Sequence, residues 1–450
     1  MGDFVPHTEA EIAQMLADIG LESLDQLFEV VPEALRLAGG LAVAPGMPEA
    51  DVLAEMGRLA SKNKVGSDLI CFAGGGAYDH DIASATTRLA FRSEFVTAYT
   101  PYQPEVAQGV LQALFEYQTL VSRLAGLPIA NASLYDGASA AVEAVNLAAA
   151  ATRRQTIWVS GGLHPHWRSV LQTFAVGTGH HLVDVPLRSG LTDWSAPPEG
   201  GEEPAALLVA SPNYLGAIED VRAARAAADR HGALLLAAID PVSAGLLRSA
   251  GEDGADVVVG EGQPFGTPLS FGGPYLGLFA CGMDQVRRLP GRLVGQTLDT
   301  EGRRAYVTTL RAREQDIRRE KASSNVCTNQ TLIAVACMIQ MSWLGTAGLR
   351  ELALRCARGT RYAREAVTAI PGVELLATAP TMREFAVSLP VPAPTVVGRM
   401  AEEGFLAGVP VGIEGGIVQD GGDALLIAVT EKRTKEEIDS FVSALEKAVR

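Results

Sequence analysis

Short apolar runs alternate with helical segments through the middle of the chain, and this alternation limits the possible folds more than any other feature. The apolar runs cover residues 156–159, 181–185, 205–210, 234–239, 257–259 and 275–280. Helical patterns lie between them, for example at 167–174 and 219–231. Strands that are apolar on both faces are typical of a mostly parallel sheet covered by helices. We therefore expect a doubly wound α/β domain with its sites beyond the carboxyl ends of the strands.

The segments on either side of this alternation predict two further parts. Residues 1–64 contain short amphipathic helices, and Thr8 with Glu11 forms a capping box at the start of the first one. Such helices cannot bury their apolar faces alone, so we expect an arm that packs on the main domain or on a partner. We assign residues 65–325 to the large domain. Residues 326–450, with strand-like runs and a final helix at 435–449, form a smaller C-terminal α/β domain.

Composition and charge exclude several classes of function. The formal net charge is -15, which argues against nonspecific binding to nucleic acid or to an anionic membrane. We find no apolar run of membrane-spanning length and no targeting segment at the N-terminus. The five cysteines are scattered without a CxxC pair, which is typical of reduced thiols. These features predict a cytoplasmic protein.

The stretch 234–274 has half of the pattern expected for a pyridoxal phosphate (PLP) site. In such a site an acid holds the ring nitrogen of the cofactor and a lysine forms the Schiff base. Asp240 follows one apolar run, and the Gly-rich turn after the next run is centred on Gln263. No lysine occurs between residues 65 and 320, since the six lysines are Lys62, Lys64, Lys321, Lys432, Lys435 and Lys447. The alternative is that Asp240 only caps its own turn.

Two loops and one helix start are further candidates for a binding site. The stretch 98–108 places Tyr99 and Tyr102, with two prolines, just before a helix, and tyrosine hydroxyls can bind a carboxylate or a phosphate, although packing alone would also explain them. Gly272 and Gly273 let the backbone approach a ligand, or simply form a tight turn. Asp136 precedes the helix at 137–152, whose N-terminus could hold a phosphate; we favour an ordinary N-cap, because an aspartate repels phosphate.

Paired histidines raise the question of a metal site. They occur at His164 with His166 and at His180 with His181. No cysteine or carboxylate cluster lies near them at ligand spacing, and adjacent side chains in a strand point in opposite directions. We therefore predict no metal.

Seven longer runs resemble one known family in chain order. They are GGGAYDH (74–80), SEFVTAYTPYQPEVAQG (93–109), LFEYQTLV (114–121), NASLYDGASA (131–140), PLSFGGPYLG (268–277), PGRLVGQT (290–297) and REQDIRREKASSNVCTNQ (313–330). Together they resemble the P-protein family of the glycine cleavage system, glycine dehydrogenase (decarboxylating), and within it subunit 1 of the two-subunit bacterial form. The resemblance extends over essentially the whole chain.

This resemblance implies a PLP-dependent transferase of fold type I that is divided into two homologous chains. The Schiff-base lysine and PLP are then expected on subunit 2 and not on this chain, with Gln263 or a neighbour in the place of the lysine. Ser139 would stand where the active copy carries an aromatic side chain. The family decarboxylates glycine, releases CO2 and passes the aminomethyl group to the lipoyl arm of the H-protein. The resemblance also implies an oxidoreductase that is active only with subunit 2, as an αβ pair that dimerises further.

By analogy with other fold-type I dimers, we expect this chain to reach across the subunit interface. Thr328 and Asn329 are the first candidates for contact with the partner's cofactor, Gly272 and Gly273 the second, and Tyr99 and Tyr102 would line the substrate side. We also expect the turn around Gln263 to face this interface. The alternative is a noncatalytic scaffold or regulatory pseudo-enzyme with a PLP fold. A self-sufficient PLP enzyme is disfavoured by the positions of the lysines.

Overall fold

The structure is a computed structural model that describes residues 7–37, 39, 41–64, 66–97, 100–195, 198, 202–326 and 328–450. The chain divides into two compact units, Met1–Lys64 and Val65–Arg450. The boundary predicted near residue 325, inside the second unit, stays a prediction.

The N-terminal unit is helical and buries little of its apolar surface. It contains α1 (Glu9–Asp18) and α2 (Glu49–Ala60), with short 3-10 turns between them. The capping box of Thr8 and Glu11 is present as predicted. Among the described residues of this unit only Leu16 is buried. Its largely exposed side chains include Val30, Leu35, Leu37, Leu41 and Val43. An arm with this much exposed apolar surface is expected to contact another protein surface.

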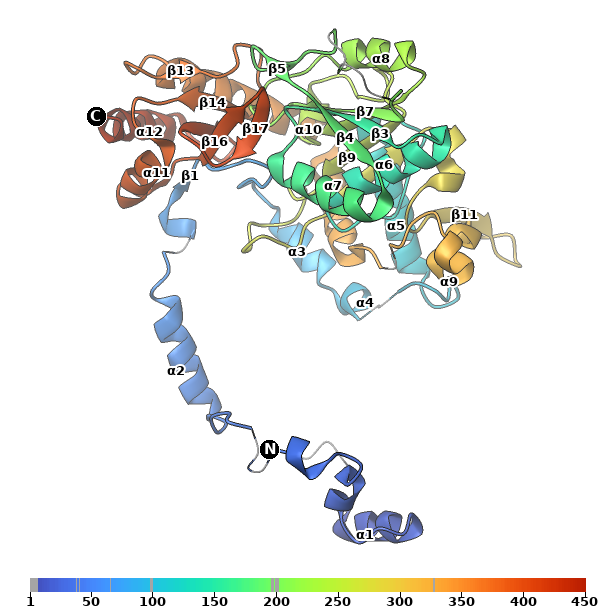
Figure 1. The fold of residues 1–450 in the computed structure, drawn as a ribbon. Helices are drawn as coiled ribbons and strands as arrows, with labels where there is room; N and C mark the ends of the chain where they lie inside the picture. The colour runs from blue at the N-terminus through green and yellow to red at the C-terminus, as the bar shows by residue number, and fades with distance from the viewer. Residues whose placement is uncertain are drawn as a thin grey trace. The chain divides into compact units, whose positions relative to one another are not determined.

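A seven-stranded sheet forms the centre of the second unit (Figure 1). Its strand order is β2-β10-β9-β8-β7-β3-β4, and all neighbouring pairs from β9 to β4 are parallel, whereas β10 is antiparallel to both of its neighbours. This confirms the predicted mostly parallel α/β architecture. The strands are β2 (Ile129–Ala130), β3 (Thr156–Ser160), β4 (His181–Val185), β7 (Ala206–Ser211), β8 (Leu234–Ile239), β9 (Val257–Glu261) and β10 (Gly277–Cys281).

Helices cover both faces of this sheet, which explains why its strands are apolar throughout. On β8, Leu235 and Ala237 belong to one core cluster and Leu236 and Ala238 to the other, because successive side chains in a strand point to opposite faces. The first cluster includes α5 (Gln108–Ala125), α8 (Val221–Arg230) and α10 (Thr331–Val367). The second includes α6 (Gly137–Thr152) and α7 (Pro165–Thr178), which lie together over the sheet in Figure 1.

Helix α10 is long and apolar enough to meet a length and composition test for a membrane span, contrary to the expectation that no such segment exists. Gly345 has non-helical angles (φ 60°, ψ -176°) and breaks the helix into two shorter pieces. Residues such as Val335, Cys337 and Met341 are buried in the protein core. The core helix of a soluble protein meets the same test, and we assign α10 that role.

The C-terminal part contains an antiparallel five-stranded sheet in the order β13-β14-β18-β16-β17. The strands are β13 (Glu374–Leu375), β14 (Glu384–Ser388), β16 (Val409–Glu414), β17 (Ile417–Asp420) and β18 (Ala424–Ala428), with helices α11 (Ala393–Glu402) and α12 (Lys435–Ala448). An early segment joins this part: β1 (Ile70–Cys71) pairs with β15 (Phe405–Leu406), and Phe72 stacks on Phe441 at 4.1 Å between ring centroids.

The remaining elements are short. Two hairpins are formed by β5 (Leu187–Arg188) with β6 (Leu191–Thr192) and by β11 (Val294–Leu298) with β12 (Arg304–Thr308). The stretch 69–108 contains β1 and the helices α3 (Ser84–Ala90) and α4 (Ser93–Val96). Helix α9 (Gln315–Arg318) lies in the run 313–330.

Candidate functional site

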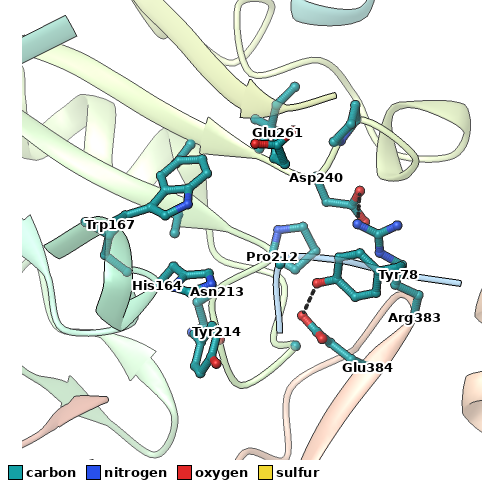
Figure 2. Close-up of a pocket in the computed structure, with 17 residues that line it drawn as sticks. Tyr78, His164, Trp167, Pro212, Asn213, Tyr214, Asp240, Glu261, Arg383 and Glu384 are labelled. Carbon is teal, nitrogen blue, oxygen red and sulfur yellow. Dashed lines mark hydrogen bonds and ion pairs between the residues drawn. The ribbon is translucent and has the colours of Figure 1, made fainter. Parts of the chain in front are cut away.

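A cavity of about 80 Å³ lies at the carboxyl ends of the parallel strands, where a doubly wound fold places its sites. Residues that follow β3, β7 and β8, together with the last residue of β9, line one side of it. The other side is formed by residues 76–78 and by the start of β14 (Figure 2). The cavity is therefore shared between the large sheet and the C-terminal sheet.

Asp240 forms a buried ion pair at this cavity. Nη2 of Arg383 lies 2.8 Å from Oδ1 of Asp240, and both side chains are largely buried. Figure 2 shows the guanidinium directed at Asp240 and beside the Tyr78 ring, 3.4 Å from its centroid. Burial disfavours the charged guanidinium, but the acidic groups around it, Asp240 first and then Tyr78 and Glu384, together outweigh this effect and the pKa of Arg383 is raised. Asp240 also accepts from the backbone N–H of Val242 at 3.0 Å, so the turn-capping role holds as well.

A second acid-base pair lies beside the first. The Tyr78 hydroxyl donates to Oε1 of Glu384 at 2.8 Å, and the backbone N–H of Gly75 donates to Oε2 at 3.1 Å. Burial raises the pKa of Glu384 to about 7. Burial also raises the pKa of Tyr78 well above its ordinary value, so the phenol keeps its proton and acts as a donor.

His80 contacts Arg383 and also belongs to a group of three side chains that could bind a metal ion. His80, Cys356 and Glu431 place one ligand atom each within 4.8 Å of one another. Nη1 of Arg383 lies 2.6 Å from Nε2 of His80, and Nδ1 of His80 lies 2.6 Å from Glu431. Because arginine can only donate, Nε2 must accept and Nδ1 carries the proton that Glu431 accepts. This tautomer leaves no free imidazole lone pair for a metal. We call Tyr78, His80, Asp240, Arg383, Glu384 and Glu431 the inner cluster.

Gln263 is buried and holds the backbone of Tyr78. Its amide nitrogen donates to the carbonyl of Tyr78 at 3.1 Å and to that of Thr267 at 2.8 Å, while its oxygen accepts from the N–H of Tyr78 at 3.0 Å. The side chain is only 1% exposed. The expectation that the turn around Gln263 faces an interface is therefore wrong for Gln263 itself. The exposed part of this loop is further along, at Leu269 and Phe271.

Glu261 lies at the N-terminus of α6. Its carboxylate accepts backbone N–H groups from Gly137 at 2.9 Å, Gln263 at 3.0 Å and Leu276 at 2.8 Å. Burial raises the pKa of Glu261 to about 8, although these three N–H groups lower it. Asp136 caps the same helix through the N–H of Ser139 at 2.6 Å, as the favoured N-cap interpretation predicts.

Aromatic side chains form the remaining wall of the cavity. They are His164, Trp167 and Tyr214, and His164 packs on Tyr214 with ring centroids 4.6 Å apart. Burial lowers the pKa of His164 to about 4, so its ring is neutral and donates from Nε2 to the carbonyl of Gly75 at 2.8 Å. His166 instead contacts Asp420, and His180 contacts Gln155 and Asn146. These contacts tie His164, His166 and His180 to groups within the chain.

The site residues predicted from the sequence lie elsewhere. Of the described ones, Tyr102, Thr328, Asn329, Gly272 and Gly273 do not line the cavity, and Tyr99 falls outside the described residues. Arg292 lies over the Tyr102 ring at 5.3 Å and donates to Asn329 at 3.2 Å, while Arg311 lies 5.6 Å from the same ring. We call Tyr102, Arg292, Arg311 and Asn329 the outer cluster. Gly272 and Gly273 belong to an exposed turn with positive φ angles of 90° and 158°.

Sequence reasoning missed Tyr78, Glu261, Arg383 and Glu384. Tyr78 was visible within the run GGGAYDH, and Arg383 with Glu384 put two charges side by side at the start of a predicted strand. Glu261 ended an apolar run, as Asp240 did. For Glu261, Arg383 and Glu384 the available signal was thus a charged residue beside an apolar run.

The sheet order and the position of the cavity define the class of protein: this is the fold of PLP-dependent enzymes of fold type I. A solved glutamate decarboxylase from Lactobacillus brevis shares the fold, with a TM-score of 0.68 at 12% identity, covering 94% of this chain and 97% of that chain.

Within this class the chain belongs to the glycine cleavage system P-protein family, whose model matches residues 2–445. A probable glycine dehydrogenase (decarboxylating) subunit 1 from Moorella thermoacetica is 48% identical over 98% of both chains. A crystal structure of glycine decarboxylase (P-protein) in inhibitor-bound form matches with a TM-score of 0.90 at 44% identity, covering 99% of this chain and 100% of that chain. The family predicted from the sequence is confirmed.

The cofactor of this fold class does not fit the residues of this chain. A PLP site needs a lysine, an acid free to hold the ring nitrogen and an anion site for the phosphate. Gln263 stands in the turn where the sequence led us to look for the lysine, and its amide is fully bonded. Asp240 is paired with Arg383, and Glu261 takes the N–H of Gly137 at the helix start.

Proposed function

We propose that this chain is one of two different subunits of a glycine dehydrogenase (decarboxylating), and that the partner subunit supplies both the lysine and the PLP. Glycine is then decarboxylated with release of CO2, and its aminomethyl group passes to the lipoyl arm of the H-protein. The observation that carries this proposal is the buried, fully hydrogen-bonded amide of Gln263 in a domain without lysine from residue 65 to 320. The relative's name, which includes "subunit 1", supports the existence of a partner.

The outer cluster supports a contribution of this chain to the partner's site. Tyr102 is 43% exposed, so its hydroxyl is available to another chain. Asn329 donates to the carbonyl of Ala132 at 2.6 Å and to Ser133 at 2.8 Å, so both of its N–H groups are used within the chain. We therefore assign Asn329 a positioning role, in which it holds Arg292 against the 131–133 turn. Thr328, Gly272 and Gly273 remain candidates for direct contact across the interface.

The inner cluster favours a second candidate function, a scaffold that contributes no atom to the partner's site. Each ionisable side chain of Asp240, Glu261, Arg383 and Glu384 at the cavity is already bonded within the chain: Asp240 to Arg383, Glu384 to Tyr78, and Glu261 to backbone N–H groups. In that case the chain only holds the partner in its active conformation.

Reconstitution with the partner subunit tests the proposal. The chain alone should show no glycine–bicarbonate exchange and no borohydride-trapped PLP adduct at a defined residue, whereas the mixture should show exchange. An adduct within this chain, or exchange by this chain alone, would contradict it.

Substitutions in the outer region separate the two candidates. Tyr102→Phe and Thr328→Val should lower exchange several-fold in a complex that still assembles, because each removes one hydroxyl and little volume. Tyr362→Phe is the matched control, since the Tyr362 hydroxyl donates to Asp439 within this chain, at 2.6 Å. Full exchange with both Tyr102→Phe and Thr328→Val would favour the scaffold.

A further inference from the structure

The N-terminus of helix α6 is already occupied by a carboxyl group that the chain supplies itself. The first N–H groups of a helix have no partner within the helix and attract negative charge. Here the Glu261 carboxylate accepts from Gly137 at 2.9 Å, and Asp136 accepts from Ser139 at 2.6 Å. Trp167 covers the same point so closely that a Cβ on Gly137 would overlap its indole ring. An incoming phosphate would have to displace Glu261 and overcome the charge of Asp136.

The acid at the end of β8 already holds a cation that the chain supplies itself. A protonated ring nitrogen would donate one hydrogen bond to the aspartate and neutralise its charge. The Arg383 guanidinium does both at 2.8 Å, with its side chain 4% exposed. Arg383 comes from the start of the C-terminal sheet, so this pair also joins the two sheets of the second unit.

The space between these two positions is too small for a pyridine ring. Glu261, Trp167, Asp240 and Arg383 all line the one cavity, whose volume is about 80 Å³. An engineered cavity that binds benzene measures about 150 Å³. The helix start is occupied by Glu261, Asp240 is occupied by Arg383, and the cavity between them is small. All three features exclude the cofactor from this site.

We propose that two side chains of this protein occupy the positions of the two ends of PLP: the Glu261 carboxyl group takes the place of the phosphate, and the Arg383 guanidinium takes the place of the ring nitrogen. The site is thereby stabilised without a cofactor and closed to it, independently of the missing lysine. This proposal rests on the fold and not on the activity of the complex. A reconstituted enzyme without exchange activity would contradict the proposed function but not this proposal.

Removing Glu261 tests whether its carboxyl group takes the place of the phosphate, with inorganic phosphate as the probe. Glu261→Ala empties the helix start, so phosphate at about ten times its Kd should raise the melting temperature of the variant by about 1–2 °C over chloride at equal ionic strength. The native chain should show no such rise. Glu143→Ala is the matched control, because Glu143 is a buried glutamate of helix α6 that bonds to Ser324 and Asn146 and not to the N–H groups of the helix start. Should Glu261→Ala be unfolded in chloride, phosphate should restore its fold.

Removing both Glu261 and Arg383 tests whether the guanidinium takes the place of the ring nitrogen, with 4′-deoxypyridoxine 5′-phosphate as the probe. This analogue keeps the phosphate and the ring nitrogen but lacks the aldehyde that reacts with lysines. It should bind Glu261→Ala/Arg383→Ala at least tenfold more tightly than inorganic phosphate, since Asp240 is then free for the ring nitrogen. In Glu261→Ala alone the two ligands should bind equally.

Three results would overturn the proposal. The first is a phosphate effect on the native chain as large as that on Glu261→Ala. The second is a Glu261→Ala chain that phosphate neither stabilises nor refolds. The third is a double variant that does not prefer the analogue over phosphate.

Discussion

The inner and outer clusters contain similar side chains but differ in exposure: the polar groups of the inner cluster are bonded within the chain and largely buried, whereas the outer cluster includes the exposed Tyr102. In the inner cluster Asp240, Arg383, His80 and Glu431 form one continuous buried chain of contacts. In the outer cluster Asn329 and Arg292 are likewise tied within the chain, yet Tyr102 remains 43% exposed. A polar group that finds its partner inside the chain stabilises the fold. A polar side chain that stays exposed, such as Tyr102, is available to another subunit. The substitutions below test this difference between the two clusters.

Arg383→Met should have the largest effect on stability. It leaves the Asp240 carboxylate buried without its partner, which typically costs about 3–5 kcal/mol. Urea unfolding of the isolated chain measures the change. Arg361→Met is the control, because Arg361 is 81% exposed in its pair with Glu365 and such pairs contribute less than about 1 kcal/mol. Equal effects of the two substitutions would mean that the inner cluster is no more important to the fold than a surface pair.

Glu384→Gln should change how stability depends on pH. The pKa of Glu384 rises from an ordinary 4.5 to about 7 in the folded chain, so the folded chain holds the proton more strongly than the unfolded chain does. Its contribution is therefore fully present below pH 4.5 and is lost as the pH rises to 7, by about 3 kcal/mol in all. The difference in unfolding free energy between native chain and variant should fall across this range. Glu365→Gln, at an exposed position, should give a flat difference.

The comparison also shows what the sequence could reveal. The strands at 156–160, 206–211 and 234–239 were predictable because both faces of each are buried, which leaves a continuous apolar run. Helix α6 was predicted at its observed bounds, since Asp136 caps its first turn. The absence of lysine from residues 65–320 was also evident from the sequence, because it requires only that the lysines be located.

The pairs of the inner cluster could not be predicted from local patterns. Arg383 lies in a different sheet from Asp240, and only the fold brings the two together. Glu261 looked like the end of a strand, and nothing nearby in the sequence connects it with Gly137. Tyr102 and Asn329 of the outer cluster were predicted by analogy with other fold-type I dimers, yet that analogy did not show that Asn329 is already bonded within the chain.

Gly137→Ala should have a smaller but specific effect at the inner site. The added Cβ would overlap the Trp167 indole, and such overpacking typically costs about 1–3 kcal/mol. Gly109→Ala is the matched control in helix α5, since a Cβ there meets nothing within 4 Å and should be neutral or slightly stabilising. Thermal unfolding distinguishes the two. A Gly137→Ala chain as stable as Gly109→Ala would show that the cofactor position is loosely packed.

Tyr102→Phe should have the smallest effect on the isolated chain. The ring stays in place over Arg292 and Arg311, and only a hydroxyl on a side chain that is 43% exposed is lost. Unfolding free energy should therefore change by less than about 0.5 kcal/mol, while exchange by the reconstituted complex falls. These opposite responses define a group that serves a partner. If Tyr102→Phe instead destabilised the free chain as much as Gly137→Ala does, the hydroxyl would serve the fold of this chain, and the distinction between the clusters would fail at its outer member.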